Sequence, residues 1–394
     1  MNTTETIRLY DEDAYATSFT GTVLSCKEVT KSDKTYYDVI LDKTLFFPEE
    51  GGQSPDKGTL GKADVLDVQI KNGIITHTLS APLDDGASVE GEIDWKHRFS
   101  NMQQHSGEHI FSGIVHNRFG FDNVGFHLSD QIVTMDFNGV MSAEQIADIE
   151  YEVNNAISKN VDIIVSYPSK EELKALEYRS KIEIEGQVRI VTVTGYDVCA
   201  CCAPHVRKTG EIGGLKVMSI QNYKGGVRIS ILCGFRMLEA FREKSAIINE
   251  LTNFLTTGQE NLLDTVTKLK NTNQALSSQL ASVKQAALEQ KLADIPADQK
   301  DVIVFESGID TKIVRNVVNG LMENHDGVCA LFVGDAASDS EDTQYNYVIG
   351  SKTVDCKELA NTLRTQLGAK GGGNSQMIQG SVCASAKNIS ECLL

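Results

Sequence analysis

The chain has 394 residues, of which 41% are hydrophobic and 23% charged, a composition typical of a protein with roughly two to four folded domains. Its formal net charge of −17 argues against a nonspecific polyanion-binding protein, although a local basic cleft is compatible with it. No run approaches the roughly 18 apolar residues of a membrane helix, and the polar N-terminus lacks the basic and apolar regions of a signal peptide, so we predict a cytoplasmic protein without a membrane segment.

The first 95 residues have the pattern of β-structure. Short runs that alternate apolar and polar residues or are rich in β-branched and aromatic residues predict strands at 36–41, 63–70 and 73–79. Turn signals of the Asn-Gly and Asp-Gly type separate such runs. Short strands at close spacing indicate a small β-barrel domain over 1–95.

From residue 96 to residue 235 the pattern changes to a mixture of helices and strands. Helical periodicity extends over 98–119, and Ser142 begins a second helix with the capping-box pattern Ser-Ala-Glu-Gln. Further runs predict strands at 132–137, 161–167 and 187–194. We therefore predict an α+β domain over 96–235.

Residues 236–296 have a seven-residue apolar repeat instead. One seam is apolar throughout, and the companion seam is interrupted by the polar residues Gln259 and Asn273. The repeat predicts a long helix, either a coiled coil, a helical hairpin arm or a helix packed against its own domain. An interaction role and simple packing are equally compatible with it. If the helix is an interaction surface, a homodimer through it or through the last domain is expected.

The last segment, 297–394, predicts a small α/β domain. Strands are expected at 302–305, 328–333 and 345–349, and helices from Asp310 to Glu323 and over 357–367. The domain ends in a glycine-rich segment that we expect to be a loop. The fold class predicted for the whole chain is thus α+β: a barrel, a metal-binding α+β domain, a long coiled-coil-like helical linker and a small α/β domain.

Two pairs of metal-ligand residues lie about ninety positions apart. His105 and His109 are four residues apart, which on a helix places both imidazoles on one face. Cys201 and His205 have the same spacing and lie in a cluster of thiols. Three imidazoles and a thiolate suit tetrahedral Zn²⁺, so we predict that the fold brings the two pairs together around zinc. Whether such a site is structural or catalytic is open at this point.

The cysteines and the glutamate beside these ligands have no assigned role. Nine cysteines are an odd number scattered over the chain, which argues against a disulfide framework. A four-ligand site needs fewer sulfurs than the cluster offers, so Cys199 or Cys202 is expected to lie outside the metal ligands. The order of residues around Glu108 differs from the HExxH motif, which favours a solvated or capping carboxylate over a general base.

Three polar segments outside the ligand pairs are candidates for substrate contacts. Gly51 and Gly52 make a tight loop where backbone can approach a ligand, with Gln53 offering an amide and Thr44 a hydroxyl, although local chemistry favours an ordinary barrel turn. Arg228 follows a glycine pair and could meet a phosphate, or it is a surface arginine of a hairpin. Lys370 and Gly372 belong to the C-terminal glycine loop, which suits a phosphate or ribose backbone or is simply flexible.

In chain order, these motifs resemble the editing half of alanyl-tRNA synthetase and its free-standing relatives, the alanyl-tRNA editing proteins of the long type. The segment Phe46-Phe47-Pro48-Glu49-Glu50-Gly51-Gly52-Gln53 is similar to the family's FYPExGGQ loop, and the ligand pairs match its HxxxH and CxxxH. Thr209-Gly210-Glu211-Ile212-Gly213 matches its TGxIG, Gly226-Val227-Arg228 its G-x-R strand, and 371–380 its glycine-rich end. No segment resembles the aminoacylation domain.

The resemblance implies that the chain hydrolyses the ester of tRNA(Ala) that carries the wrong amino acid, chiefly Ser-tRNA(Ala), with Gly-tRNA(Ala) as the second candidate. It implies Zn²⁺ held by His105, His109, Cys201 and His205. Gln53 is implied near the reacting ester, and Thr44 is suited to recognise the seryl hydroxyl. The remaining expected contacts with tRNA are Arg228, Gly51, Gly52, Lys370 and Gly372.

The sequence departs from the family's pattern in three places, and two other functions stay open. Glu50 stands where the family usually has a small residue, Cys202-Ala203-Pro204 replaces Gly-Gly-Thr, and 374–376 lacks a usual arginine. One alternative is editing of another aminoacyl-tRNA, because threonyl-tRNA synthetase editing domains share the zinc-type motif. The other is a noncatalytic, zinc-stabilised RNA-binding or assembly protein, whose closed four-ligand site would be structural.

Overall fold

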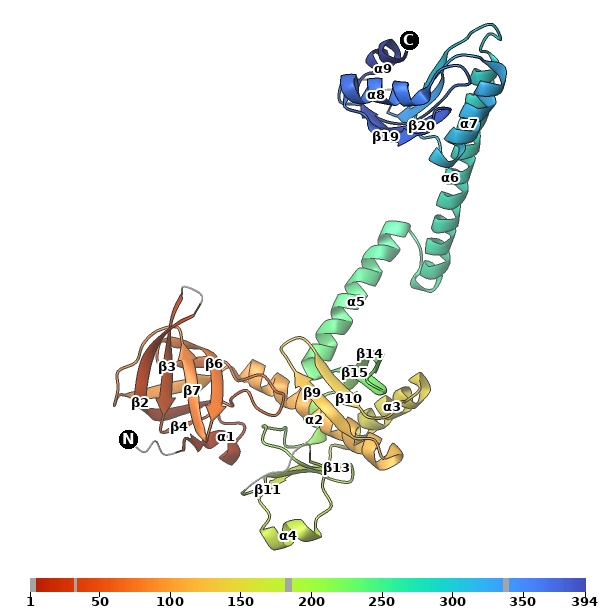
Figure 1. The fold of residues 1–394 in the computed structure, drawn as a ribbon. Coiled ribbons are helices and arrows are strands. Elements are labelled where there is room, and N and C mark those ends of the chain that lie inside the picture. The colour runs from red at the N-terminus through yellow and green to blue at the C-terminus, as the bar shows by residue number, and fades with distance from the viewer. Residues whose placement is uncertain (1–4, 32–33, 181–185, 336–339) are drawn as a thin grey trace. The chain divides into compact units, whose positions relative to one another are not determined.

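In the computed structural model, six strands near the N-terminus pair in the order β2-β3-β7-β6-β5-β8, and β8 pairs with β2 to close the ring (Figure 1). The structure describes residues 5–31, 34–180, 186–335 and 340–394. Alternating side chains such as Val23, Leu41, Val68 and Leu79 point inward and form an apolar core. The strands are β2 (Ser18–Lys31), β3 (Lys34–Leu41), β5 (Gly58–Leu60), β6 (Ala63–Lys71), β7 (Ile74–Leu79) and β8 (Ser88–Ile93).

A short parallel pair and a short helix stand at one end of this barrel. Strand β1 (Ile7–Arg8) pairs with β4 (Lys43–Thr44), and α1 (Leu9–Glu12) follows β1 directly. The buried Tyr10 of α1 packs edge-on against Phe47, with ring centroids 5.4 Å apart. This end of the barrel therefore positions both α1 and the loop that follows β4.

Helix α2 (Trp95–Phe119) is the central element of the next region. Asp94 caps its first turn by accepting from the backbone N–H of His97, and Gly120 ends it in the left-handed conformation. Every residue from Met102 to Val115 is buried, so the helix has no solvent-facing side along this stretch. It contacts α3, β9, β13 and β15, which surround it.

Two sheets and one amphipathic helix cover α2. The four-stranded sheet has the order β14-β15-β10-β9, and the three-stranded sheet has the order β11-β12-β13. Ser142 and Gln145 form the capping box that begins α3. The elements are β9 (Asn123–Leu128), β10 (Val133–Phe137), α3 (Ala143–Lys159), β11 (Ile163–Ser166), α4 (Lys170–Ala175), β12 (Ile190–Val193), β13 (Asp197–Ala200), η1 (Thr209–Ile212), β14 (Leu215–Tyr223) and β15 (Gly226–Cys233).

The segment 236–296, for which the sequence left one long helix or a helical hairpin open, contains two helices. Helix α5 (Gly234–Leu255) ends before Thr256, which adopts a left-handed φ of 49°, and α6 (Leu262–Ala293) begins after the short η2 (Gln259–Asn261). A non-glycine residue in that conformation cannot continue a right-handed helix. The seven-residue register of the sequence passes through this break without a change of phase, so periodicity alone could not locate the break.

The C-terminal unit contains a five-stranded sheet in the order β16-β17-β18-β20-β19. Two apolar clusters pack on this sheet. The first includes Phe332 and Ile378, and the second includes Val304 and Leu331. Leu288 of α6 belongs to the second cluster. The elements are β16 (Val302–Glu306), α7 (Thr311–Asn324), β17 (Cys329–Gly334), β18 (Gln344–Gly350), α8 (Cys356–Leu367), β19 (Lys370–Gly373), β20 (Met377–Cys383) and α9 (Ala386–Leu393).

The mixed α+β class predicted from the sequence is confirmed, and one local prediction is wrong. The segment from Lys370 to Gly373 is an edge strand that pairs with β20, whereas the sequence predicted a loop. A Cβ at Gly371 or Gly373 would lie within 2.3 Å of backbone atoms of β20, so these glycines allow close strand approach.

The chain divides into two units, 1–248 and 249–394, and the finer four-part division stays a prediction. Among the described helices, none combines the length and the apolar character that a membrane crossing requires.

Candidate metal centre

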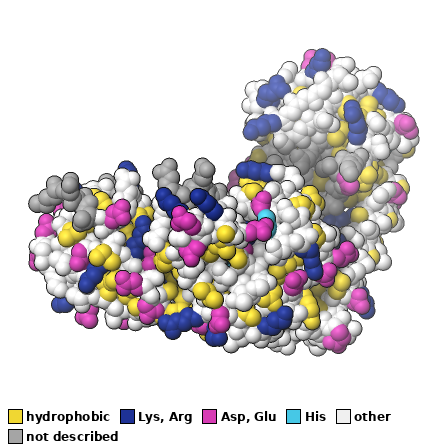
Figure 2. Space-filling view, turned by 90° about the horizontal axis from the view of Figure 1, so that it is seen from below, with side chains coloured by type: hydrophobic (Ala, Val, Ile, Leu, Met, Phe, Trp, Pro, Cys, Tyr) yellow, Lys and Arg dark blue, Asp and Glu magenta, His cyan; other side chains and the backbone are white. Residues whose placement is uncertain are grey.

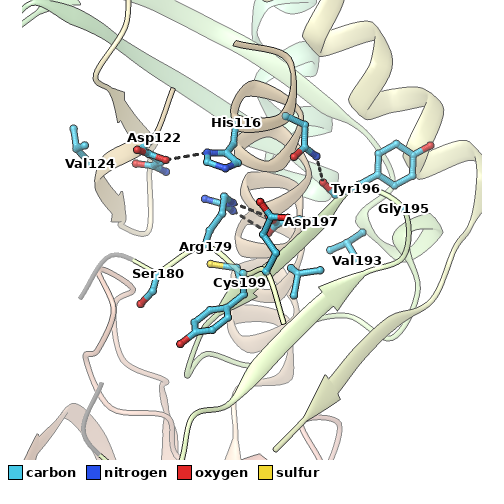
Figure 3. A pocket seen from close by; sticks show the side chains of 15 residues that line it. His116, Asp122, Val124, Arg179, Ser180, Val193, Gly195, Tyr196, Asp197 and Cys199 are labelled. Carbon is cyan, nitrogen blue, oxygen red and sulfur yellow. Dashed lines mark hydrogen bonds and ion pairs between the residues drawn. The ribbon is translucent and has the colours of Figure 1, made fainter. Parts of the chain in front are cut away.

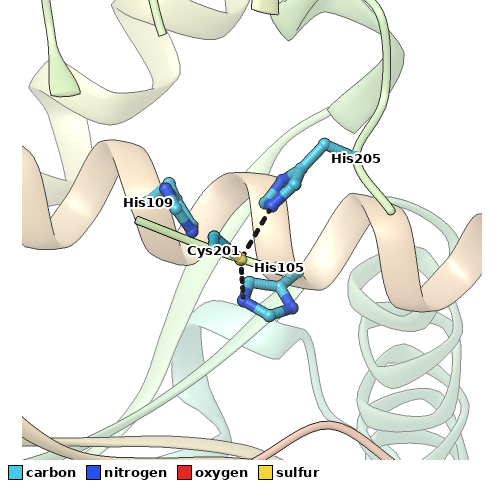
Figure 4. Close-up of side chains that lie close together, drawn as sticks. All are labelled: His105, His109, Cys201 and His205. Atoms are coloured by element: carbon cyan, nitrogen blue, oxygen red, sulfur yellow. Dashed lines mark hydrogen bonds between the residues drawn. The ribbon is translucent and has the colours of Figure 1, made fainter. Parts of the chain in front are cut away.

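The two distant ligand pairs meet inside the N-terminal unit. His105 and His109 lie one turn apart on α2, and Cys201 and His205 follow β13 (Figure 4). One potential ligand atom from each of the four residues lies within 4.8 Å of the others. Cys201 Sγ is 3.6 Å from His105 Nε2 and 3.4 Å from His205 Nε2. The three histidines are buried, and Cys201 is half-buried.

These separations fit a tetrahedral metal ion. With metal–sulfur and metal–nitrogen bonds of about 2.3 and 2.05 Å, tetrahedral geometry separates sulfur and nitrogen by about 3.5 Å. The observed distances of 3.4 and 3.6 Å bracket that value. Because three imidazoles and one thiolate are ligands that zinc prefers, the donor chemistry and the spacing agree.

Each imidazole is oriented through its other ring nitrogen. His105 Nδ1 lies 2.8 Å from Gln53 Oε1, His109 Nδ1 lies 2.9 Å from Asp197 Oδ2, and His205 Nδ1 lies 3.0 Å from Ser106 Oγ. Amide and carboxylate oxygens can only accept, so His105 and His109 donate from Nδ1 and keep the Nε2 lone pair for a metal. This arrangement fixes the tautomer that metal binding needs.

Electrostatics within the cluster favour a bound cation. Burial raises the pKa of the Cys201 thiol, but the imidazoles of His105 and His205 outweigh burial, and the pKa lies well below its ordinary value. Burial lowers the pKa of His205 to about 3. For His109, hydrogen bonds to Asp197 and Cys201 outweigh burial and raise the pKa well above the ordinary value. A thiolate that favours a proton on the His109 ring is a site where a divalent cation can take the place of that proton.

Asp197 is itself held by an arginine. Arg179 donates to its two carboxylate oxygens over 2.7 and 2.9 Å, and this bidentate pair is almost fully buried at the carboxylate. Asp197, His109 and Cys199 form a second close group, and burial raises the pKa of the Cys199 thiol to about 11. Cys199 therefore stays a protonated thiol beside the ligands, in keeping with the expectation that one clustered cysteine lies outside the ligand set.

Removing the charge of Asp197 is expected to weaken metal binding without removing a ligand. In Asp197→Asn we expect metal affinity to fall about 10–100-fold, because the carboxylate orients His109 and raises its basicity. Competition with a chromophoric chelator measures this change. Asp162→Asn is the matched control, since this carboxylate is 62% exposed and pairs with Lys208. Equal affinity of both variants would show that Asp197 does not support the site.

Glu108 is buried, which contradicts the expectation of a solvated or capping carboxylate. It is 2% exposed and accepts hydrogen bonds of 2.6 Å from both Ser112 and Asn123. Its other oxygen lies 4.0 Å from His109 Nε2. The expectation was wrong because α2 is surrounded by protein, so a residue that points 100° away from a ligand still points inward.

The loop between β4 and β5 delivers Gln53 to the cluster. Gly51 and Gly52 have φ of 62° and 84°, and a Cβ on Gly52 would lie 2.4 Å from the carbonyl oxygen of Phe126. The loop is bound to β9, since Leu128 N–H donates to Gly52 and Ser54 N–H donates to Leu128. The ordinary barrel turn favoured by local chemistry is therefore a loop that reaches into the metal cluster.

A cavity of about 1270 Å³ opens onto the four-residue cluster. It is bounded by the barrel end, the Gly51–Gly52 loop, α2, β9 and the segment that leads to Cys202. Among the predicted residues, His105, His109, Cys201, Gly51 and Gly52 line it. Its acidic and basic lining residues are Glu5, Asp11, Glu12, Glu50, Glu108, Arg8, Arg179 and Arg189.

A second cavity of about 750 Å³ adjoins the first, with Arg179 and Cys199 in the wall of both (Figure 3). Figure 3 shows the Arg179 guanidinium pointing to Asp197, and His116 paired with Asp122 at the rim. Arg179, which lines both cavities, donates to the Asp197 carboxylate, and that carboxylate orients His109. Arg179 therefore also helps to hold the candidate metal cluster in place.

Two predicted residues of the same unit, Thr44 and Arg228, are not among the residues that line this cavity. Thr44 is fully buried and bonds His77 Nε2 over 2.9 Å and the Phe46 N–H, so its hydroxyl is already used. Arg228 pairs with Asp136 and stacks on Tyr223, 3.9 Å from the ring centroid. Lys370 and Gly372 lie on the edge strand β19 of the other unit.

Sequence reasoning missed the supports of the ligands. No motif marks the residues that support the imidazoles, and each lies far in sequence from the residue it contacts. These residues are Asp197, Ser106 and Arg179. Ser106 stands between the two histidines, but its partner is on another segment, so no local pattern indicates the contact. Asp197 precedes Cys201 by four residues, and this position was the only available signal.

Comparisons with known proteins agree with this architecture. Residues 188–230 match the model of the threonyl and alanyl tRNA synthetase second additional domain, which includes Cys201 and His205. Residues 1–97 match the class II (A) tRNA synthetase model, and this range contains the segment 46–53 on which the sequence resemblance partly rests.

Curated relatives cover most of the chain. The alanyl-tRNA editing protein Aarsd1 of Mus musculus is 30% identical over 68% of this chain and 68% of its own length. Aarsd1 of Rattus norvegicus is 28% identical over 94% and 93%, and AlaX-L of Pyrococcus horikoshii is 27% identical over 98% and 97%. A solved C-Ala domain of Aquifex aeolicus alanyl-tRNA synthetase aligns with 23% of this chain at 24% identity, with a TM-score of 0.19 that is too low to inform on the fold. The chain belongs to the family of alanyl-tRNA editing proteins.

Proposed function

We propose that this protein hydrolyses the ester of misacylated tRNA(Ala) in trans, chiefly Ser-tRNA(Ala), with Gly-tRNA(Ala) as the second candidate. The observation that carries the proposal is the four-residue ligand cluster at the wall of a large cavity in a member of the editing family. The cavity exceeds the about 300–1,000 Å³ of ordinary small-molecule pockets, as a substrate joined to a nucleotide requires. In the reaction, water adds to the ester carbonyl, the bond to the ribose oxygen breaks, and free amino acid and tRNA are released.

We propose Zn²⁺ as the metal, held by His105, His109, Cys201 and His205. Zinc bound there would organise the pocket and would supply Lewis-acid chemistry, which either orients the terminal ribose of the tRNA or activates a water. The chain's residues supply the rest: Gln53, Asp197 and Ser106 fix the ring orientations, and the three imidazoles are buried at the wall of the cavity. An aminoacyl ester is already activated, so positioning and electrostatic stabilisation can suffice for its hydrolysis.

Gln53 has a second proposed role at the reacting ester. Its Oε1 accepts from His105, whereas its buried Nε2 has no hydrogen-bond partner among the described residues. A buried N–H₂ group beside the cluster is suited to donate to the ester oxygen as negative charge develops there. Thr44 differs, because its hydroxyl bonds His77 inside the barrel, and the prediction that it reads the seryl hydroxyl has no support from its position.

Binding of tRNA has to rely on local cations. The net charge is −17, and Figure 2 shows Lys and Arg side chains interspersed with Asp and Glu over the face drawn. Arg228 and Lys370 stay proposed contacts, with Gly51 and Gly52 at the cavity. The Arg228 side chain is 35% exposed and forms an ion pair with Asp136. Because Asp136 partly neutralises the guanidinium, the attraction of Arg228 for a phosphate is reduced. Such binding weakens steeply with added salt.

A homodimer through α6 is proposed from its heptad pattern. The apolar positions Leu262, Val266, Leu269, Leu276, Leu280 and Val283 alternate at spacings of four and three, with Asn273 in the same seam. Leu269, Leu276, Leu280 and Val283 are 55–65% exposed in the single chain. Val266, Asn273 and Leu280 fall at a positions, and d positions hold Leu262, Leu269, Leu276 and Val283. One Asn among apolar a positions favours a parallel two-stranded coil, in which Asn273 meets its counterpart. Lys270 and Lys284 fall at e positions, where an antiparallel coil would oppose like charges.

Charged substitutions in this seam test the dimer. Leu276→Asp is expected to convert a dimer to a monomer in sedimentation equilibrium, because a buried carboxylate in the seam has no partner. Ser277→Asp is the matched control, since it adds the same charge one position outside the a and d seam. A wild-type monomer at micromolar concentration would refute the coiled-coil dimer and leave the editing proposal intact.

The two alternative functions make different predictions in one assay. Purified protein is incubated with Ser-tRNA(Ala), Ala-tRNA(Ala) and another mischarged tRNA under single-turnover conditions. We expect selective release of serine from tRNA(Ala). Faster release from the other tRNA would indicate editing of a different aminoacyl-tRNA, and tight binding without release would indicate a noncatalytic RNA-binding protein. The cytoplasmic location stays a prediction.

A further inference from the structure

Glu108 is a buried carboxylate at the wall of the large cavity, beside the candidate metal cluster. It lines this cavity together with His105, His109 and Cys201, and its side chain is 3% exposed. Taking a carboxylate out of water costs free energy that a neutral side chain of similar size would not incur. A carboxylate at this position therefore points to a chemical role rather than to packing alone.

One oxygen of Glu108 is held by two donors of the protein. Ser112 Oγ and Asn123 Nδ2 both donate to Oε1 over 2.6 Å, and both donor side chains are themselves buried. Asn123 Nδ2 also lies 3.2 Å from Ser112 Oγ, so the three side chains form a closed network between α2 and β9. This network fixes the direction of the carboxylate.

The second oxygen of Glu108 lies on the side of the cluster. Glu108 follows His105 by three positions on α2, so the two side chains are neighbours on the helix surface. Oε2 lies 4.0 Å from His109 Nε2, the ring nitrogen that faces the cluster because Nδ1 bonds Asp197. Among the described residues, the close group at this point consists of the three histidines and Cys201. Glu108 is therefore a neighbour of the candidate metal centre and not a fifth ligand.

A carboxylate oxygen in this position can accept a hydrogen bond from a water in the cavity. Each carboxylate oxygen has two acceptor positions, so the contacts of Glu108 inside the protein are compatible with one more donor. A water that attacks an ester must present a lone pair to the carbonyl carbon. An acceptor that holds one hydrogen of this water sets that orientation.

We propose that Glu108 accepts a hydrogen bond from the water that attacks the ester carbonyl, which makes it a catalytic residue of the hydrolysis. The inference rests on the proposed ester hydrolysis and adds the residue that orients the nucleophile. The covalent steps are those given for that hydrolysis, and Glu108 acts before the bond to carbon forms. This role is compatible with zinc that orients the ribose and with zinc that activates the water.

The test replaces the nucleophile. Single-turnover deacylation of Ser-tRNA(Ala) is measured with and without hydroxylamine for wild type, Glu108→Gln, Ser112→Ala and the control Glu152→Gln. Serine and seryl hydroxamate are quantified separately, and the uncatalysed reaction is subtracted. Hydroxylamine is a much stronger nucleophile than water and needs no acceptor to orient it. Glu152 is 40% exposed in its side chain and pairs with Arg118 at the surface. Zinc content and circular dichroism are measured for each variant.

We expect Glu108→Gln to release serine about 10²-fold more slowly than wild type at saturating enzyme, with the half-saturating enzyme concentration changed by less than about twofold. The amide keeps the size of the side chain and still accepts from Ser112, but its NH₂ group can only donate to the water. Formation of seryl hydroxamate should stay within about threefold of wild type, because this reaction does not depend on an oriented water. Ser112→Ala should raise the ratio of hydroxamate to serine by a smaller factor, and Glu152→Gln should match wild type for both products.

Three results would overturn the inference alone. One is an equal loss of both products in a folded, zinc-containing Glu108→Gln, because a structural or substrate-binding role affects both nucleophiles. Another is unchanged release of serine by that variant. If Glu108→Gln loses zinc or its fold, Ser112→Ala decides, and a wild-type ratio of the two products in Ser112→Ala would be the third. Wild type that releases neither product from Ser-tRNA(Ala) would overturn the proposed function and the inference with it.

Discussion

Cys201→Ala is expected to remove tight metal binding and to lower kcat/KM for Ser-tRNA(Ala) by at least about 10³-fold, because it deletes the only thiolate of the four-ligand cluster. Cys201 Sγ is within 3.6 Å of two ligand imidazoles, so its loss opens the site on the cavity side. The measurement combines metal analysis of the purified variant with single-turnover deacylation.

The control for this variant is another free cysteine. Cys383 is exposed and lies on β20 of the C-terminal unit, so Cys383→Ala is expected to keep the metal content and rate of wild type. If Cys201→Ala binds no metal and still hydrolyses Ser-tRNA(Ala) at the wild-type rate, the metal has no part in the reaction.

Arg98→Met is expected to destabilise the N-terminal unit by about 3–5 kcal/mol, because it leaves the Asp56 carboxylate buried without its counter-charge. Both side chains are fully buried, and Arg98 Nε donates to the two carboxylate oxygens over 3.0 and 2.9 Å. Arg98 also donates to the carbonyl oxygens of Ala14 and Leu45. Denaturant unfolding followed by fluorescence reports on this unit, because the only tryptophan, Trp95, lies in the same helix.

An exposed ion pair in the same region is the comparison for Arg98. Lys57 and Asp130 are each 49% exposed, and Lys57→Met is expected to change the free energy of unfolding by less than about 1 kcal/mol. Asp56 also accepts from the Phe47 N–H and bonds the Phe47 carbonyl through its backbone, so the pair closes the base of the loop that carries Gln53. Equal effects of Arg98→Met and Lys57→Met would contradict the assignment of the buried pair as the anchor of this loop.

The two pairs that converge in the candidate metal centre could be singled out because the spacing within each pair is local. A four-residue spacing places both side chains on one face of a helix, and imidazole and thiolate ligands favour zinc. His105 and His109 could therefore be proposed as a ligand pair from the amino-acid sequence alone. Their orienting partners could not be assigned. Gln53 and His105 are 52 residues apart, and Asp197 and His109 are 88 apart, so these contacts exist only once the barrel, α2 and β13 have packed.

Two wrong predictions and one undecided feature have a common physical cause, which is that the sequence pattern does not report on tertiary surroundings. Glu108 was assigned to solvent because helices usually have a polar face, but α2 is buried on all sides over its middle turns. The heptad seam continued across Thr256, whose left-handed backbone ends α5. The glycines at 371–373 indicated a loop, but they allow β19 to approach β20 closely.

The most direct test of metal-dependent editing is single-turnover deacylation of Ser-tRNA(Ala) and Ala-tRNA(Ala) by the full chain before metal removal, after chelation, and after zinc is restored. We expect serine to be released selectively, the rate to fall with the bound metal, and one equivalent of zinc to restore it. Full activity of metal-free protein, or binding of Ser-tRNA(Ala) without release of serine, would contradict the account.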